Sequence, residues 1–286
     1  KLVGKKLKKE DLEKIQMMGF PIERTDDKTI AYEVFPNRPD MLCLEGFARA
    51  ARTYLGVAKG LSEYKTKKGS IKIRVDKSVD AVRPCIACAA VHDVKITDDF
   101  LRSLMQLQEK LHETLGRKRK KVAIGLHDLD RIKSPFEYKA VAPESVKFVP
   151  LDFQEEMNMR DIGARHPKGK DYIHIIEASR VWPIITDARN QVLSFPPIIN
   201  SELTRVAERT KNIFIEITGT DNIAVNQAMN IVATAFAERG CTIESVDVIS
   251  KGKRVSSPNL SPTKIKVDVK YANKLLDMKL TEKEFS

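Results

Sequence analysis

Two polar side chains interrupt an apolar segment in the second half of the chain. In the string IFIEIT at 213–218, strand alternation places Phe214, Glu216 and Thr218 on one face and three isoleucines on the other. A carboxylate and a hydroxyl on an otherwise apolar face are costly if they are buried without partners. We therefore expect Glu216 either to meet a specific partner or to be an exposed strand residue paired with a lysine.

The middle of the chain holds three further groups that could transfer a proton: His112, His127 and Asp128. Each also has an ordinary structural explanation, which we favour, and no nucleophile with an adjacent base is evident. Any hydrolysis in this region would therefore use a positioned water molecule rather than a protein nucleophile.

The cysteines argue against a metal or disulfide site. Cys85 and Cys88 form a C-x-x-C, but they lie in an apolar strand-like segment, where residues three apart point to opposite faces. A zinc site would also need two more ligands at suitable spacing, and the histidines show no paired arrangement. With Cys43 and Cys241 they are typical of reduced thiols, and we predict no metal.

A helix is predicted directly before a basic run. Thr97 is a good N-cap, and leucines then recur at helical spacing up to Gly116. Gln108 falls close to the leucine stripe, so its amide is either a satisfied core group or a ligand contact. The run Arg117, Lys118, Arg119, Lys120 and Lys121 follows, and it is either a phosphate-binding segment or a solvated helix end.

The remaining pattern indicates an α+β fold, with helices against a mostly antiparallel sheet. We expect a strand at 122–128, a long connection through 147–172, and short apolar strands at YIHII, VWPIITD and QVLSFPPII. The turn at 187–190 predicts a hairpin, and Pro196 and Pro197 should end its pairing and extend the backbone. A strand at 212–218, a helix at 222–239 and a strand at 242–249 complete the unit.

The most specific string is FPNRPDMLCLEGFARAARTYLG, at 35–56. Pro39 suits the first turn of a helix, and Asp40 and Glu45 suit its positive end. Apolar spacing predicts a single amphipathic helix whose buried face comprises Leu44, Phe47, Ala48, Ala51, Tyr54 and Leu55.

Polar stretches divide the 286 residues into three parts: an N-terminal domain (1–70), a central domain (71–255) and a tail (256–286). Thr281 and Glu284 form a capping box that announces a helix just before the chain stops, and residue 1 is not Met. We therefore expect a fragment of a longer polypeptide, with the tail starting a further domain.

The charge favours an anionic partner. Fifty Lys and Arg against 39 Asp and Glu leave a net charge of +11, which is typical of nucleic-acid binding but not diagnostic of it. No segment approaches the roughly 18 apolar residues of a membrane span, and the N-terminus lacks the apolar stretch of a signal peptide. We expect a cytoplasmic protein without a membrane partner.

Three sets of residues carry a family resemblance: the NRPD string with its helix, QLQEKLHETLGRKRKKVAIGLHDLD at 106–130, and LSFPPIINS with NIFIEITGTD at 193–221. Together, in order along nearly the whole chain, they resemble the N-terminal part of the phenylalanyl-tRNA synthetase β subunit of the archaeal and eukaryotic-cytosolic type. The central domain resembles the editing module of that subunit.

The resemblance implies hydrolysis of tyrosine wrongly esterified to the phenylalanine tRNA. It implies that Glu216 accepts a hydrogen bond from the tyrosine hydroxyl, where relatives can carry Asp. Thr218 and Ser194 would help to bind this substrate. Ile185, a Leu in related sequences, would pack against the aromatic ring of the tyrosine. Asn200, Gln108 and Arg119 would hold the terminal adenosine and the ester, and we assign Asn200 and Thr218 as the catalytic pair.

The resemblance also implies partners and cofactors. The parent enzyme resembles a tetramer of two α and two β chains that binds tRNA(Phe), and its α subunit activates phenylalanine with ATP and Mg²⁺. The present chain holds no recognisable ATP-binding signature, so we expect editing without a cofactor and no aminoacylation. Two alternatives stay open, namely a non-catalytic tRNA-binding and subunit-interaction module, and a free-standing deacylase.

Overall fold

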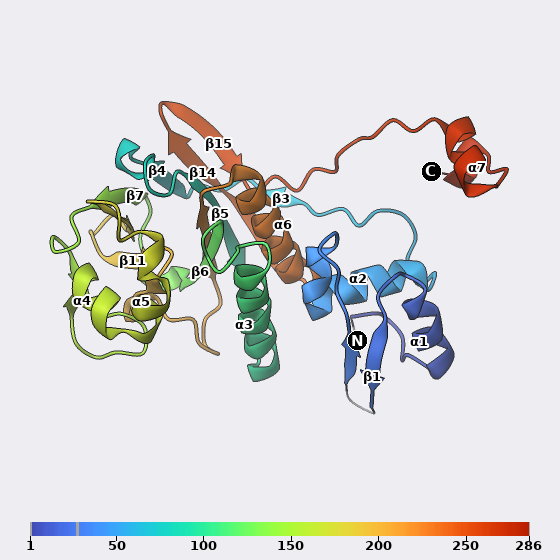
Figure 1. Cartoon of the computed structure of the whole chain (residues 1–286), viewed down its shortest axis with the longest axis horizontal. Coiled ribbons are helices and arrows are strands. Elements are labelled where there is room, and N and C mark those ends of the chain that lie inside the picture. The colour runs from blue at the N-terminus through green and yellow to red at the C-terminus, as the bar shows by residue number, and fades with distance from the viewer. Residues whose placement is uncertain (1, 27–28, 286) are drawn as a thin grey trace.

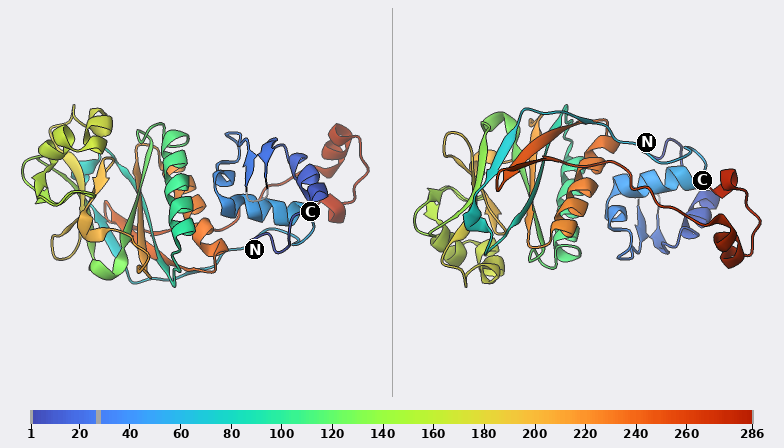
Figure 2. Two further views of the ribbon diagram at one scale, coloured as in Figure 1. Left: turned by 90° about the horizontal axis from the view of Figure 1, so that it is seen from below. Right: turned by 90° about the horizontal axis from the view of Figure 1, so that it is seen from above.

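The structure is a computed structural model that describes residues 2–26 and 29–285. The chain is elongated, and its parts follow one another along the long axis (Figures 1 and 2). A small N-terminal unit packs on two long helices, which cover one face of a large sheet. A helical lobe lies on the far side of that sheet, and the C-terminal helices lie at the end of an extended segment, towards the same end of the long axis as the N-terminal unit.

The N-terminal unit has its own apolar core. It contains α1 (Lys9–Gln16), the antiparallel pair β1 (Ile22–Thr25) and β2 (Ile30–Tyr32), the 3₁₀ helix η1 (Pro39–Leu42) and α2 (Leu44–Tyr54). The prediction of one continuous helix after Pro39 is wrong, because Cys43 is extended and separates η1 from α2. η1 passes so close to α2 that a Cβ at Gly46 would lie 1.8 Å from the carbonyl oxygen of Asp40.

The buried face of α2 also differs from the expected one. Phe47, Ala48 and Ala51 are buried, but Leu44 and Tyr54 are about half exposed. Glu45 is buried instead, because it forms an ion pair with Arg239 at the end of α6 (Asn222–Glu238). The periodicity predicted that α2 packs through one apolar face. In the structure α2 packs on the apolar core of its own unit and also makes a polar contact with the central domain, through Glu45.

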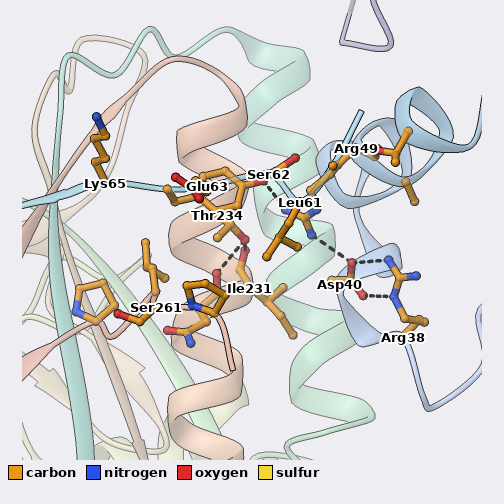
Figure 3. Close-up of a pocket in the computed structure, with 18 of the residues that line it drawn as sticks. Arg38, Asp40, Arg49, Leu61, Ser62, Glu63, Lys65, Ile231, Thr234 and Ser261 are labelled. Carbon is orange, nitrogen blue, oxygen red and sulfur yellow. Dashed lines mark hydrogen bonds and ion pairs between the residues drawn. The ribbon is translucent and has the colours of Figure 1, made fainter. Parts of the chain in front are cut away.

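A large open pocket lies between the N-terminal unit and α6 (Figure 3). Asp40 accepts hydrogen bonds there from Arg38 (2.9 Å) and Arg49 (3.0 Å), and Arg49 also donates to Tyr64 (2.9 Å). The NRPD string is therefore used internally, since its charged residues fix η1 to α2 and to the segment that leads into the central sheet.

The central sheet is mostly antiparallel, as expected for the α+β fold. Its strand order is β12-β11-β10-β7-β4-β14-β5-β13-β6, with β15 and β3 also paired to β14. The strands are β3 (Thr66–Lys67), β4 (Lys72–Val75), β5 (Cys85–His92), β6 (Val122–Asp128), β7 (Phe136–Val141), β10 (Trp182–Thr186), β11 (Val192–Phe195), β12 (Ile199–Asn200), β13 (Ile213–Gly219), β14 (Thr242–Ser250) and β15 (Lys253–Ser257).

The sheet curls on itself around β14. The first half of β14 pairs with β5 and its second half pairs with β4, so that two arms of the sheet face each other across one core. Phe136 of β7 and Phe214 of β13 meet there with ring centroids 4.5 Å apart. The two ends of the sheet also come together, because the side-chain amide of Asn200 in β12 donates to Leu126 O in β6 (3.2 Å).

Helices α3 (Asp98–Glu113) and α6 cover the outer face of β5, β13 and β6. Both faces of these strands are therefore buried, which explains their nearly continuous apolar sequence. The predicted alternation in β13 is confirmed: its isoleucines pack under the helices, and Phe214 lies in the core between the arms. The Thr97 cap, the helix at 222–238 and the hairpin at 187–190 are confirmed as well.

The segment between β7 and β10, which contains the long connection predicted at 147–172, is more ordered than expected. It forms the helical lobe, with β8 (Lys147–Phe148), β9 (Met157–Asn158), α4 (Met159–Arg165), α5 (Pro167–Tyr172) and the 3₁₀ helix η4 (Ile173–Ile175). The prediction that YIHII is a strand is wrong, since these residues end α5 and form η4. Capping by Asn158 and His166 at the starts of α4 and α5 decides the structure here.

Pro196 and Pro197 do not extend the backbone as predicted. They reverse it, so that β12 folds back antiparallel on β11 and Asn200 becomes the register partner of Ser194. Ile198 N donates to Phe195 O (2.8 Å) and closes this turn. The reversal brings Asn200 to the edge of β6.

The C-terminal segment ends in α7 (Val269–Leu276) and α8 (Glu282–Phe285). The predicted capping box is confirmed, because Thr281 N donates to Glu284 (2.9 Å) and Glu284 N donates to Thr281 (3.3 Å). β3 and β15 carry the sheet slightly past the expected boundaries at 70 and 255, and the division into three domains stays a prediction. Over the described residues, no helix is both long and apolar enough to cross a membrane.

Buried His112 should make stability depend on pH. Burial lowers the pKa of His112 from 6.5 to about 4. As pH falls from 7 to 4 the unfolded chain takes up a proton that the folded chain resists, so stability is lost in this window. We expect His112→Gln to remove about 3 kcal/mol of this loss, measured by urea unfolding at pH 4, 5, 6 and 7. Parallel pH curves for the two proteins would contradict it.

Candidate functional site

A cavity of about 240 Å³ opens where the two ends of the curled sheet meet. Its walls come from α3, β6, β13, the turn between β11 and β12, and the rim of the helical lobe. Five of the predicted site residues line it: Gln108, Arg119, Ser194, Asn200 and Glu216. The fold thus brings together residues that are more than 100 positions apart in the sequence.

Glu216 is the acidic group of this cavity. It is 3% exposed, which excludes the exposed strand residue paired with a lysine. Its Oε1 accepts a hydrogen bond from Ser194 Oγ (3.0 Å), while its buried Oε2 has no hydrogen-bond partner. Gly125 stands opposite in the register, and a Cβ there would lie 2.3 Å from Oε1. The carboxylate therefore occupies space that only a glycine leaves free.

His127 approaches the same carboxylate from β6. Its Nδ1 lies 2.8 Å from Thr204 Oγ1, and the Thr204 hydroxyl can itself donate to Ser201 O (3.1 Å). The hydrogen bond to Thr204 therefore assigns the neutral His127 tautomer that carries its proton on Nδ1. Its Nε2 has no hydrogen-bond partner and lies 3.8 Å from Glu216 Oε1. Two buried polar atoms therefore face each other without a hydrogen bond, and a ligand hydroxyl could satisfy one of them.

The amides of Gln108 and Asn200 satisfy the open edge of β6. β6 ends the sheet, so alternate backbone groups on its outer side lack a strand partner. Gln108 donates to Ile124 O (2.7 Å), Asn200 donates to Leu126 O, and Ile124 N donates to His112 Nε2 (2.9 Å). Each amide uses its nitrogen for the strand, and within the described part of the chain its oxygen has no hydrogen-bond partner.

Arg119 is held rigidly at the other side of the cavity. Its guanidinium donates to Ile198 O (2.9 Å) and to Glu109 (3.1 Å), and it stacks on the ring of Tyr172 (4.3 Å). His112 and Arg119 together lower the pKa of Glu109 to about 2, in spite of partial burial. Arg119 Nε is buried without a partner, so one donor remains for a ligand.

The basic run is not one uniform surface. Arg117, Lys118 and Arg119 follow one another in the left-handed region (φ 46°, 53° and 64°), which costs roughly 1 kcal/mol or more per residue. This turn buries Arg119 and leaves Arg117, Lys118 and Lys120 exposed. Lys121 is half-buried and pairs with Asp221 (2.8 Å).

Two of the residues predicted to bind the substrate or act on it do not line the cavity, in addition to the four predicted tRNA-binding residues of the basic run. Ile185 is fully buried in the core between the arms, where it is the register partner of Ser194. Thr218 is also fully buried, and its hydroxyl accepts a hydrogen bond from Arg83 Nε (2.9 Å). Both therefore support the residues of the cavity from behind.

Sequence reasoning missed Gly125, Thr204 and Arg83. A glycine inside the apolar run VAIGLHD is a signal of close approach by another group, and it could have identified Gly125. Nothing in the local pattern identified Thr204 or Arg83.

The structural explanations of Asp128 and of the cysteines hold. Asp128 accepts from Thr210 Oγ1 (2.8 Å) and from Asp130 N (3.1 Å), where it caps the 3₁₀ helix η3 (Leu129–Arg131). Cys85 and Cys88 pack against opposite cores, as predicted for β5. Among the described residues, no group of three or more His, Cys, Asp or Glu could hold a metal ion.

Comparison with known proteins connects this site to one family. The pattern of the B3/4 domain matches residues 104–250, which include every residue that lines the cavity. The phenylalanine–tRNA ligase β subunit of Methanothrix thermoacetophila is 50% identical over 96% of this chain and 51% of its own length. That of Archaeoglobus fulgidus is 46% identical over 96% of this chain and 50% of its own length.

A solved structure agrees in fold. The N-terminal fragment of the phenylalanyl-tRNA synthetase β subunit from Pyrococcus horikoshii superposes with a TM-score of 0.93 at 38% identity, over 99% of this chain and 83% of that one. The chain spans about half the length of the curated relatives. With these matches to both sequence and fold, the chain belongs to the family of phenylalanyl-tRNA synthetase β subunits and carries its B3/4 domain.

Proposed function

We propose that the cavity at Glu216 is an editing site that hydrolyses the ester between tyrosine and tRNA(Phe). One observation carries the proposal: Glu216 Oε2 is buried beside a cavity and has no hydrogen-bond partner. A tyrosine hydroxyl that donates to this oxygen would satisfy it, with Ser194 holding the other carboxylate oxygen in place. A volume of about 240 Å³ is near the lower end of small-ligand pockets, and it suits an aminoacyl group.

The physical reason for such a site is the limited selectivity of the pocket that binds phenylalanine for attachment to the tRNA. An apolar pocket for phenylalanine rejects a substrate with an added hydroxyl by only about a hundredfold. A site that hydrogen-bonds the hydroxyl can reject phenylalanine by roughly 10⁴ to 10⁵, because the missing group leaves a buried acceptor unpaired. The buried Glu216 carboxylate supplies this second selection, which requires the hydroxyl that the first pocket rejects only weakly.

The other side of the cavity suits the ester and the terminal adenosine. Gln108 and Asn200 each direct an amide oxygen that the protein does not use, and Arg119 offers its unpaired Nε. We assign to Asn200 the positioning of the attacking water, with Gln108 and Arg119 holding the tRNA end. Ile185 and Thr218 act indirectly, by fixing Ser194 and β13 from behind.

The family supplies the wider setting of this proposal. The parent enzyme joins phenylalanine to tRNA(Phe) in the cytoplasm with two α and two β subunits, and ATP and Mg²⁺ serve the activation step on the α subunit. Editing by this chain needs neither cofactor, and the chain alone does not aminoacylate. The exposed Arg117, Lys118 and Lys120 contact phosphates of the tRNA acceptor end.

The carboxylate is tested directly by Glu216→Gln, which keeps the size of the side chain and removes its charge. Hydrogen bonds to charged groups contribute about 1.5–3 kcal/mol. We therefore expect the ratio of deacylation rates on Tyr-tRNA(Phe) and Phe-tRNA(Phe) to fall by about ten- to a hundredfold. Rates are measured with both esters on the purified chain.

Glu244→Gln is the matched control, since Glu244 lies on β14 outside the cavity and pairs with His92. It should leave the ratio unchanged. Equal wild-type rates on both esters, or activity on neither, would reject the editing proposal and leave the non-catalytic tRNA-binding module. An unchanged ratio in Glu216→Gln would reject the role of this carboxylate.

Gly125→Ala tests the geometry without removing a functional group. The added Cβ would lie 2.3 Å from Glu216 Oε1 and 2.9 Å from His127 Nε2, so the carboxylate must move. We expect the tyrosine rate to fall by about tenfold or more while the helical content is retained. Circular dichroism and the same deacylation assay check this, and a fully active variant would show that the carboxylate position is not critical.

The exposed basic residues predict a salt-dependent contact. Replacing Arg117, Lys118 and Lys120 with Gln should make the slope of log K against log salt for tRNA(Phe) shallower by about 2–3 units. The exposed Lys264, Lys266 and Lys270 of the C-terminal segment form the matched control triple. Filter binding between 50 and 300 mM salt, as an approximate range, measures both, and equal slopes in the two triple variants would contradict a specific contact.

A further inference from the structure

Arg83 is a buried cation without an ionic partner. It lies in the turn before β5, is 1% exposed and is among the largest fully buried side chains. Among the described residues no carboxylate comes within ion-pair distance of its guanidinium. Removing an arginine from water costs several kcal/mol unless its donors are satisfied and a negative charge lies near. Burial lowers its pKa from 12.5 to about 10, so it stays charged at neutral pH.

The donors of Arg83 join two elements of the editing cavity. Nε and Nη2 donate to the hydroxyl (2.9 Å) and carbonyl (2.7 Å) of Thr218 on β13. Nη1 donates to Lys120 O (3.2 Å), in the left-handed turn that buries Arg119. Tyr138 on β7 donates to the carbonyl of Arg83 itself (2.7 Å), so the facing arm of the sheet is fixed as well.

Arg83 binds β13 on the face that carries Glu216. Thr218, which accepts two hydrogen bonds from the guanidinium, and Glu216 are two residues apart on the same face of β13. Tyr138 and then Glu216 favour the charged form of Arg83 against the cost of burial. The other groups near this carboxylate are His127 on β6, Ser194 on β11 and the Cys88 thiol on β5. None of these carries a permanent positive charge. Arg83 and Arg119 are therefore the lasting cations of the region, and only Arg119 has an ionic partner.

We propose that Arg83 is a positioning residue for tyrosine recognition, which locks β13 to the turn at 117–121 and serves as the buried counter-charge of Glu216. It touches no substrate. It keeps the carboxylate and Arg119 at a fixed separation, so that the hydroxyl end and the ester end of the substrate are held together. This inference rests on the proposed editing function and goes beyond the residues assigned to it.

The test uses the ratio of kcat/KM for Tyr-tRNA(Phe) to that for Phe-tRNA(Phe), measured on the whole chain. Arg83→Met keeps the length and removes the charge and its donors, and we expect the ratio to fall about tenfold or more. Arg83→Lys keeps the charge but loses the forked donors that join Thr218 to Lys120 O, so its ratio should fall less than that of Arg83→Met. Loosening of the fold alone would slow both substrates equally and leave the ratio unchanged.

Tyr138→Phe is the matched control, because it deletes a buried hydrogen bond to Arg83 and keeps the cation. Its ratio should stay within about twofold of wild type. If Arg83→Met does not fold, Thr218→Val replaces it, since it removes one acceptor of the guanidinium and should lower the ratio about threefold or more.

The outcomes separate the two proposals. A wild-type ratio near one would reject the editing function and this inference together. A tyrosine-selective wild type with an unchanged ratio in Arg83→Met, or in Thr218→Val where that variant is used, would reject only the role of Arg83. A ratio in Arg83→Lys as low as that in Arg83→Met would likewise reject the counter-charge, because the lysine keeps the charge.

Discussion

The burial of one carboxylate constrains the site more than any other interaction. Glu216 sits on a strand that is covered on both faces, and charge in such a place is tolerated only with partners. Ser194 satisfies one oxygen, and Gly125 leaves the space. Among the described residues the second oxygen, buried beside the cavity, has no hydrogen-bond partner, and the proposed selection of a hydroxyl rests on this feature.

The curl of the sheet couples this carboxylate to the rest of the cavity. A sheet that ended at β6 would expose unpaired backbone groups, which invite pairing with another chain. Here side chains from α3 and β12 close that edge, through His112, Gln108 and Asn200. Two of these three groups, Gln108 and Asn200, also line the cavity. Changes at Gln108 or Asn200 should therefore affect stability and recognition together, whereas Ser194 and Glu216 lie away from the edge.

Sequence periodicity correctly predicted the elements whose structure depends only on the local spacing of residues. The alternation of β13 and the Thr97 cap depend on local spacing and are as expected. The reversal at Pro196 could not be predicted, because both an extended and a reversed chain suit two prolines, and contact with β6 decides between them. Glu45 shows the same limit: its burial depends on Arg239, 194 residues away, and no local pattern contains that partner. Five cavity residues were predicted through family resemblance, and the glycine in VAIGLHD could have pointed to Gly125. The contributions of Thr204 and Arg83 needed coordinates.

Net charge overstates how much of the basic run can meet a polyanion. Of the five consecutive basic residues at 117–121, two already have partners in the protein. Arg119 binds backbone carbonyls, Glu109 and the ring of Tyr172, and Lys121 pairs with Asp221. The left-handed turn that buries Arg119 also forces its neighbours outward, so Arg117, Lys118 and Lys120 are the cations that face solvent. Backbone strain of a few kcal/mol in this turn thus sorts adjacent charges into two roles. Arg119 is fixed at the cavity, where salt screens its charge less. Arg117, Lys118 and Lys120 remain in solvent, where salt screens their charges.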